Sequence, residues 1–197
     1  MQKKRTLWSQ AGLQLLRELS LKPWASCRRA DLLGLLGMLD EQIGKLDQAV
    51  QKAAEQHPQA RLLMTQPGVG PNTALAFVLT IGDASRFARG KQVASYLGLI
   101  PREESSGGRQ KLGAISKQGN RLVRSLLVEA AQIAVRYDPE FRKQYLHRCH
   151  QKPKGVAKVA AARKLAVRLY WMLRTQVGYP EIVRIESSPR VPRIGAS

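Results

Sequence analysis

Two adjacent serines followed by two glycines form the densest group of reactive side chains in the sequence. They lie within residues 99–113, a segment with the composition of a loop and with basic residues on both sides. A serine hydroxyl can attack a phosphodiester and form a phosphoserine link, if a base or metal activates it and cations hold the phosphate. The residues that could do this are Ser105 and Ser106 with Gly107, Gly108, Arg102, Arg109 and Lys111. The alternative interpretation is a flexible basic loop whose serines are incidental.

The turn at residues 66–70 is a second candidate site. It separates two helical patterns, at about 60–64 and 71–80, as in a helix-hairpin-helix motif. In such a motif the turn amides and the amino end of the second helix point at the DNA backbone, so binding is independent of the DNA sequence. The candidate contacts are Gly68, Val69 and Gly70, and the alternative is a plain turn between two core helices.

A third basic segment leads into a strong helical pattern over residues 120–137. Its periodicity predicts an inward face made by Leu122, Leu126, Ala130 and Ile133. Arg121 and Arg124 should then face outward, and Lys117 precedes the helix. These three cations are further candidates for contacts to DNA phosphates.

The element that precedes these segments is a long helix over residues 30–57. Apolar side chains recur at alternating spacings of four and three, as in a heptad seam, and charged residues lie off the seam. We expect this helix to pair with a second copy or with a folded-back segment, and the alternative is an amphipathic helix that covers its own domain. A shorter helix is predicted over residues 6–20, closed by Lys22 and Pro23.

The carboxy-terminal part also has the pattern of helices. A helix should restart at Asp138 and Pro139, and a last helix over 156–176 carries a basic set, Lys158, Arg163, Lys164 and Arg168. No segment has a convincing strand pattern, so the predicted fold class is all-α. We expect a remnant over 1–29, a coiled-coil helix over 30–60, a helix-hairpin-helix domain over 61–150, a basic helix over 151–183 and a disordered tail over 184–197.

The net charge indicates a polyanionic partner. The sequence has 33 Lys and Arg against 14 Asp and Glu, a formal charge of +19, and most of the excess lies after residue 60. Nucleic acid explains this best, because phosphate contacts accumulate over many cations. A ribosomal type of protein and an anionic membrane surface are the less favoured explanations.

Several other classes of site find little support in the sequence. No apolar run approaches the length of a membrane span and no signal peptide is evident, so a cytoplasmic location is expected. Cys27 and Cys149 have no close-spaced partner and should be free thiols. His147, Cys149 and His150 are interpreted as a chance cluster rather than a metal site, because structural zinc needs four ligands in two pairs.

Four short motifs, in this order and spacing, resemble the bacterial insertion-sequence transposases of the IS-one-ten and IS-eleven-eleven family. The close resemblance covers about 75 residues, and the heptad helix lies where that family has a coiled coil. The motifs are Gln66-Pro67-Gly68-Val69-Gly70, Ser85-Arg86-Phe87 with Tyr96-Leu97-Gly98-Leu99, Ser106-Gly107-Gly108, and Gly113-Ala114-Ile115-Ser116-Lys117-Gln118-Gly119-Asn120.

The resemblance implies a serine nucleophile in this small helical domain. By position it is Ser106, the serine before the glycine pair, with Ser105 as the fallback. It also implies a RuvC-like domain with four acidic metal ligands ahead of the coiled coil, Mg²⁺ for the complete enzyme, and a structured guide RNA as a partner.

The sequence departs from the family in its acidic residues. About 30 residues precede the heptad helix, with Glu18 as their single carboxylate, and no set of four acidic ligands is evident. We therefore expect a fragmentary transposase or a partner subunit that binds no cofactor alone, binds DNA or structured RNA, and lacks cleavage activity by itself. The alternatives are a non-catalytic helix-hairpin-helix protein that regulates full-length transposase through the coiled coil and, less favoured, a repair glycosylase, for which Asp83 lies too close to the hairpin.

Overall fold

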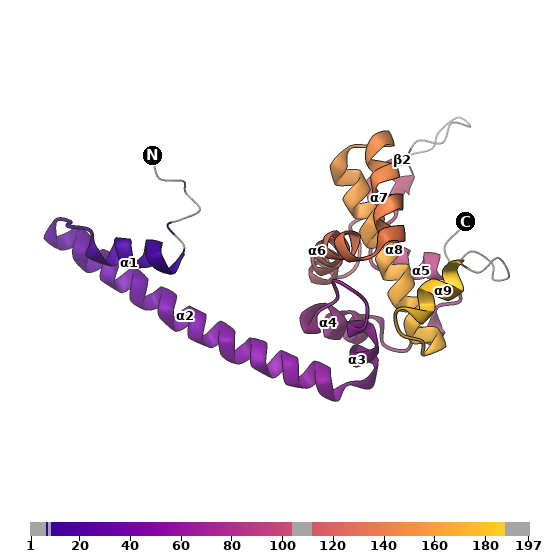
Figure 1. The fold of residues 1–197 in the computed structure, drawn as a ribbon, viewed down its shortest axis with the longest axis horizontal. Helices are drawn as coiled ribbons and strands as arrows, with labels where there is room; N and C mark the ends of the chain where they lie inside the picture. Colours follow the sequence, from indigo (N-terminus) through magenta and orange to yellow (C-terminus); the bar gives the residue numbers. More distant parts are fainter. Residues whose placement is uncertain (1–6, 8, 104–111, 188–197) are drawn as a thin grey trace. The chain divides into compact units, whose positions relative to one another are not determined.

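The computed structural model describes residue 7 and residues 9–103 and 112–187 (Figure 1). The chain divides into two compact units, residues 1–49 and residues 50–197. Both units are mainly helical, which confirms the predicted all-α class. None of the described helices is long and apolar enough to cross a membrane.

The first unit pairs a short helix with the beginning of a long one. Helix α1, Gln10–Glu18, is capped by Ser9, whose side chain accepts a hydrogen bond from the Gly12 amide. Helix α2, Pro23–Gln56, begins seven residues before the predicted start at 30. Pro23 therefore opens α2 instead of closing the first helix, because proline fits the first helical turn, where its missing N–H has no partner to lose.

Helix α1 folds back along the amino-terminal half of α2 (Figure 1). Leu16 of α1 lines an apolar hollow together with Leu32, Leu36 and Leu39 of α2. The folded-back segment that the heptad pattern allowed is thus present for this part of α2. The seam remains largely exposed all the same: Leu32, Leu39, Ile43 and Leu46 are 56%, 51%, 55% and 65% exposed.

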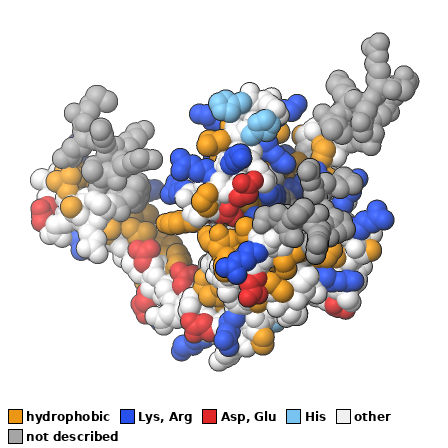
Figure 2. Space-filling view, turned by 45° about the vertical axis from the view of Figure 1, so that its right-hand side comes forward, with side chains coloured by type: hydrophobic (Ala, Val, Ile, Leu, Met, Phe, Trp, Pro, Cys, Tyr) orange, Lys and Arg blue, Asp and Glu red, His pale blue; other side chains and the backbone are white. Residues whose placement is uncertain are grey.

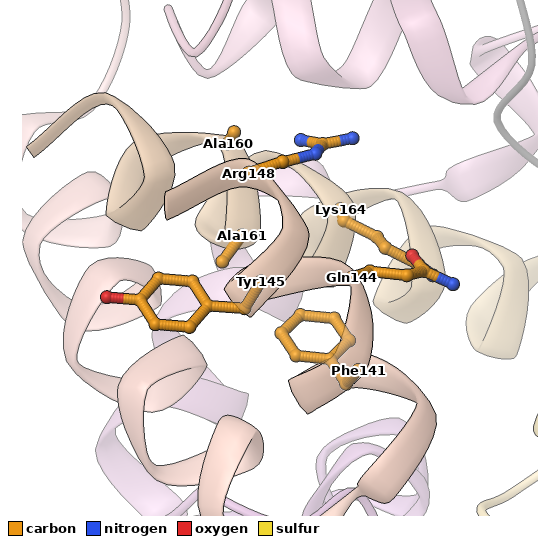
Figure 3. A pocket seen from close by; sticks show the side chains of 7 residues that line it. All are labelled: Phe141, Gln144, Tyr145, Arg148, Ala160, Ala161 and Lys164. Carbon is orange, nitrogen blue, oxygen red and sulfur yellow. The ribbon is translucent and has the colours of Figure 1, made fainter. Parts of the chain in front are cut away.

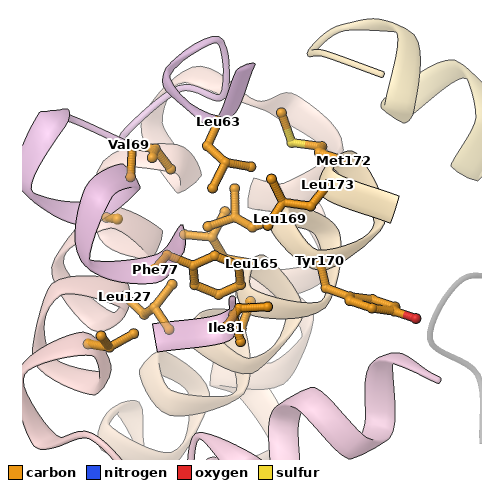
Figure 4. Packing of buried hydrophobic residues seen from close by; sticks show 14 of the residues in the cluster. Leu63, Val69, Phe77, Ile81, Leu127, Leu165, Leu169, Tyr170, Met172 and Leu173 are labelled. Carbon is orange, nitrogen blue, oxygen red and sulfur yellow. The ribbon is translucent and has the colours of Figure 1, made fainter. Parts of the chain in front are cut away.

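The second unit is built around one long buried helix, α8, Lys154–Thr175, which contacts most of the others. Its side chains Leu165, Leu169, Met172 and Leu173 pack against Leu63, Phe77 and Leu127 in the core of this unit (Figure 4). The remaining elements are α3 Pro58–Met64, α4 Pro71–Ile81, the 3-10 helix η1 Ala84–Arg86, α5 Gly90–Tyr96, β1 Pro101–Glu103, β2 Leu112–Ile115, α6 Arg121–Tyr137, α7 Pro139–Gln151 and α9 Glu181–Ser187.

A buried ion pair links the beginning of α7 to α8. The guanidinium of Arg168 donates to a carboxylate oxygen of Asp138 at 2.7 Å, and the two side chains are 1% and 2% exposed. Asp138 also caps α7 by accepting from the Phe141 amide, which confirms the predicted cap. Arg168 was grouped with the basic set of this helix as distinct from its apolar face, but it is buried there and neutralises a core carboxylate.

Three further sequence predictions need correction. On α6 the buried face consists of Val123, Leu127, Ala130, Ala131 and Ala134, whereas Leu122 and Ile133 are 61% and 43% exposed.

Two strands exist where none was predicted, because runs of three and four residues are too short for a period-two pattern. Helix α9 includes residues 184–187, where a disordered tail was expected, since Ile182 anchors it in the core. Residues 188–197 lie outside the described part of the chain.

Candidate nucleic-acid interface

The strands β1 and β2 form the stem from which the serine-containing segment emerges. They pair antiparallel, with Pro101 opposite Ile115 and Glu103 opposite Leu112. The pairing continues toward the core, because the Ser116 amide donates to the Ile100 carbonyl at 2.8 Å and the Lys117 amide donates to the Gly98 carbonyl at 3.2 Å. The segment between the strands is thus held at its base by a ladder of backbone hydrogen bonds.

Two glycines allow the two sides of this stem to cross at close range. Gly98 and Gly119 both have positive φ, 67° and 74°. A Cβ atom at Gly98 would lie 2.1 Å from the Gln118 carbonyl oxygen, and one at Gly119 would lie 2.2 Å from the Tyr96 carbonyl oxygen. Any larger residue would force the backbones apart, so two of the recognised motifs are the two halves of one stem.

Arg124 and Asn120 fasten the stem to the helices. One guanidinium nitrogen of Arg124 donates to the carbonyls of Leu97, Gln118 and Gly119. Asn120 caps α6 by accepting from the amides of Leu122 and Val123. Its side-chain nitrogen donates to the Thr80 hydroxyl at 3.3 Å, which joins the start of α6 to the end of α4.

The candidate nucleophiles themselves lie outside the described residues. This holds for Ser106 and for the fallback Ser105, and for the predicted DNA contacts Gly107, Gly108, Arg109 and Lys111. Of the cations around the stem, Arg102, Lys117 and Arg121 are exposed. Arg102 donates to the Ser116 carbonyl at 3.3 Å, which keeps its charge beside β2.

The turn between α3 and α4 gives its three candidate residues different roles. Gly68 has a φ of 88°, and a Cβ there would lie 2.4 Å from the Ala130 carbonyl oxygen of α6. Val69 is 5% exposed and belongs to the core. Gly70 precedes the first turn of α4, is exposed and has open space where a Cβ would be, so of the three it alone presents room for a phosphate.

The segment around η1 contains two charged residues, Asp83 and Arg86, whose contacts the sequence did not predict. Arg86 lies over the rings of Phe87 and Tyr96, at 4.5 Å and 4.7 Å from their centroids. Arg86 belongs to one of the motifs that carry the family resemblance, but no local sequence pattern indicates its stacking partner Tyr96, ten residues later. Two hydrogen bonds from Ser85 lower the pKa of the Asp83 carboxyl.

Arg174 and Tyr170 of α8 hold this segment in place. The Arg174 guanidinium donates to the carbonyls of Ala84, Ser85 and Phe87, and the Tyr170 hydroxyl donates to the Phe87 carbonyl at 2.7 Å. Their contacts lie more than 80 residues away in sequence, so no local pattern could have indicated them.

The described residues contain no group of three or more His, Cys, Asp or Glu side chains that could hold a metal ion. In the described part of α7, His147 and His150 are exposed and His147 pairs with Gln151. The carboxylate set that Mg²⁺ requires is therefore not provided by these residues.

Comparison with known proteins connects this arrangement to one group of enzymes. A probable family 20 transposase from Pseudomonas aeruginosa is 37% identical over 142 residues, which is 70% of this chain and 42% of that protein. The transposase for insertion sequence element IS1111A from Coxiella burnetii is 36% identical over 98 residues, 50% of this chain and 27% of that protein.

A pilin gene-inverting protein from Moraxella bovis is 37% identical over 141 residues, 69% of this chain and 42% of that protein. The chain thus spans less than half the length of each of these relatives. Residues 60–146, which contain the α3–α4 turn, the stem and α6, match the Transposase IS116/IS110/IS902 family. Over this segment the chain is thus similar to the IS116/IS110/IS902 family of transposases.

Proposed function

We propose that this chain binds DNA and contributes Ser106 as the nucleophile for strand cleavage and rejoining in transposition. The observation that carries the proposal is the stem: residues 98–103 and 112–119 form a pinned support on both sides of the serine-containing segment. A nucleophile must be held within a fraction of an ångström of its target, and a backbone ladder anchored by Arg124 suits that task.

In the proposed step, the Ser106 oxygen attacks a DNA phosphorus atom. An Oγ–P bond forms and one deoxyribose oxygen leaves, taking up a proton, while the serine proton passes to a base. Attack by a hydroxyl of another strand reverses the exchange and restores the serine. Exposed cations beside the stem, Arg102, Lys117 and Arg121, would bind neighbouring phosphates.

The described residues offer no carboxylate cluster for a metal, so we propose that the chain acts together with a family member that carries the acidic half of the site. A structured RNA from the element is a further partner that the family resemblance implies. Alone, the chain should bind nucleic acid without cleaving it.

A covalent-capture experiment tests the serine. The chain, carrying a mass tag, is incubated with element-end DNA, Mg²⁺, the element's RNA and a full-length family transposase whose own serine is replaced by Ala. We expect a DNA adduct on the tagged chain that Ser106→Ala abolishes and Ser105→Ala retains. An adduct that survives the Ser106→Ala and Ser105→Ala double substitution would refute a serine nucleophile.

The second candidate function is regulation of full-length transposase by pairing through α2. It is favoured by the exposed seam residues Ile43 and Leu46, which nothing in the described chain covers. If the chain alters transposition in cells equally well with both serines replaced by Ala, the regulatory function is supported and the catalytic one is not.

A further inference from the structure

We infer that the groove between α7 and α8 is a separate binding site for the phosphodiester backbone of a duplex nucleic acid. The site consists of Arg148 and Lys152 from α7 and its end, and Arg163 and Lys164 from α8; we call it the α7–α8 groove. It does not depend on the serine chemistry proposed above, although both involve nucleic acid.

The charge balance of this part of the chain is the first observation. Residues 139–164 contain eight Lys and Arg but a single acidic residue, Glu140. Helix α2 is different, with five acidic and four basic residues over Pro23–Gln56 and an ion pair between Lys45 and Glu41. Figure 2 shows blue Lys and Arg side chains gathered around the pale-blue histidines. Solubility alone does not require such a local excess.

The second observation is that Arg148 of α7 and Lys164 of α8 line the same hollow, with Arg163 next to Lys164 in the sequence. Burial lowers the pKa of Arg163, and the neighbouring charge of Arg148 lowers it further. Among the described residues, no carboxylate forms an ion pair with Arg148 or Arg163. Two like charges held together without a counter-ion destabilise the fold, and an anion between them would remove the repulsion.

The side chains at the groove are arranged for an extended anion rather than a small molecule. Figure 3 shows Arg148 and Lys164 projecting to the same side as Gln144, while Tyr145 points away. The hollow that they line with Phe141 has a volume of only about 10 Å³, room for one water-sized group. The charged groups therefore lie along its rim, where a backbone could pass over them.

The single acidic side chain lies at one end of the groove. Glu140 accepts a hydrogen bond from the Gln144 amide at 3.1 Å, and the Gln144 oxygen in turn accepts from Lys164. Lys152 is the residue directly after α7, and its amide donates to the Arg148 carbonyl at 2.9 Å, so the chain at Lys152 lies next to Arg148. The cationic end is thus the end near Arg148, Lys152 and Arg163.

Phosphodiester oxygens fit these groups because a guanidinium offers paired planar donors that match a phosphate. A duplex backbone places phosphates at regular spacing, so one strand can engage several cations at once. Such contacts are independent of base sequence. DNA and RNA duplexes share this chemistry, and the experiment separates them.

The test compares two double variants with equal loss of charge. Arg148→Gln with Arg163→Gln removes the two arginines of the α7–α8 groove. Arg136→Gln with Arg142→Gln removes two exposed arginines elsewhere on α6 and α7. Binding to a DNA duplex and to an RNA duplex of the same unrelated sequence is measured by fluorescence anisotropy over a salt series.

We expect the groove variant to lose roughly tenfold or more in affinity and its salt slope to fall by about 2, because two phosphate contacts disappear. The control should lose less than about threefold. Loss on one duplex type identifies that type as the ligand. Equal losses in the two variants, or full retention on both duplexes, would overturn the inference.

Further measurements distinguish a loss of binding at the groove from a loss of folding and from a failure of the serine proposal. Arg148→Gln should leave Tm unchanged or raise it, because it removes a repulsion; a lower Tm without weaker binding contradicts the inference. In the unaltered chain, bound duplex should protect Lys152 and Lys164 from acetylation more strongly than it protects Lys91. Equal protection of the three lysines contradicts the inference. The Ser105→Ala and Ser106→Ala double variant should bind with unaltered affinity, whatever its activity.

Discussion

Gly68 and Gly70 lie two residues apart in the same motif but have different physical reasons to be glycine. At Gly68 the backbone is left-handed and α6 lies against it, so the absent Cβ permits helix packing. At Gly70 the φ is −90° and the space is open, so no packing constraint excludes a side chain. Only the latter is free to serve a ligand.

Substitution of these glycines should separate stability from binding. Gly68→Ala should lower the free energy of unfolding by more than about 2 kcal/mol, since it adds a clash with backbone to an unfavourable φ. Gly70→Ala should change it by less than about 0.5 kcal/mol. Urea denaturation measures both. Gly70→Glu should then weaken DNA binding at unchanged stability, and equal stability losses at the two positions would contradict this division.

The buried pair of Arg168 and Asp138 should be costly to break from one side. Arg168→Met leaves an uncompensated carboxylate in the core and should cost about 3 to 5 kcal/mol. Adding Asp138→Asn should recover part of that loss, because the remaining charge is removed while the helix cap is kept. Lys45→Met in the exposed pair with Glu41 is the control, expected to cost less than about 0.5 kcal/mol. Thermal unfolding provides the comparison, and a double variant less stable than Arg168→Met would disprove the explanation.

At the scale of elements, the stem depends on pairings that join distant segments. Residues 98–100 and 115–117 meet through backbone hydrogen bonds, and Arg124 holds the crossing from α6. The stem has few backbone hydrogen bonds, so we expect its order to depend strongly on the Arg124 side chain. A helix depends less on any single side chain.

Arg124→Gln should therefore accelerate amide hydrogen exchange at Ser116 and Lys117 by roughly tenfold or more while the core amides keep their protection. Arg121→Gln, on the exposed face of the same helix, should leave exchange unchanged but weaken DNA binding. Exchange measured by NMR or mass spectrometry checks both. If the two variants behave alike in exchange, Arg124 is not what holds the stem.

Three helix starts at a proline or at an Asp or Asn cap were predictable because those signals are local, whereas Pro23 was assigned to the wrong end of a helix. Pro71, Asp138 and Asn120 open helices where the sequence placed them. The buried face of α6 was predicted incorrectly, since Leu122 and Val123 are both apolar and neighbouring elements decide which one is covered. The strands β1 and β2 depend on a partner about ten residues away, so short-range patterns could not reveal them.

At the scale of the whole molecule, α2 presents apolar side chains that nothing described in the chain covers. The seam side chains Leu32, Leu39, Ile43 and Leu46 are all more than half exposed. A row of this kind at heptad spacing favours pairing with a second helix.

We expect the chain to form dimers that Ile43→Glu with Leu46→Glu abolishes. Gln42→Glu with Gln48→Glu changes the charge of the same helix equally, at exposed polar positions, and should keep the dimer. Light scattering after size-exclusion chromatography measures the mass. A monomer before substitution, or dissociation by the control, would rule out pairing through this seam.

The sequence by itself determined the all-α class, the basic character, the family motifs and Ser106 as the candidate nucleophile, because composition, capping residues and spaced motifs are local properties. Only the tertiary structure decided that Gly98 and Gly119 form one crossing, that Arg168 is buried against Asp138, and that the charge of Arg148 acts on Arg163. These relations join residues from 15 to 30 positions apart, and their energies depend on burial and on neighbouring charges. Such quantities exist only once the helices have packed.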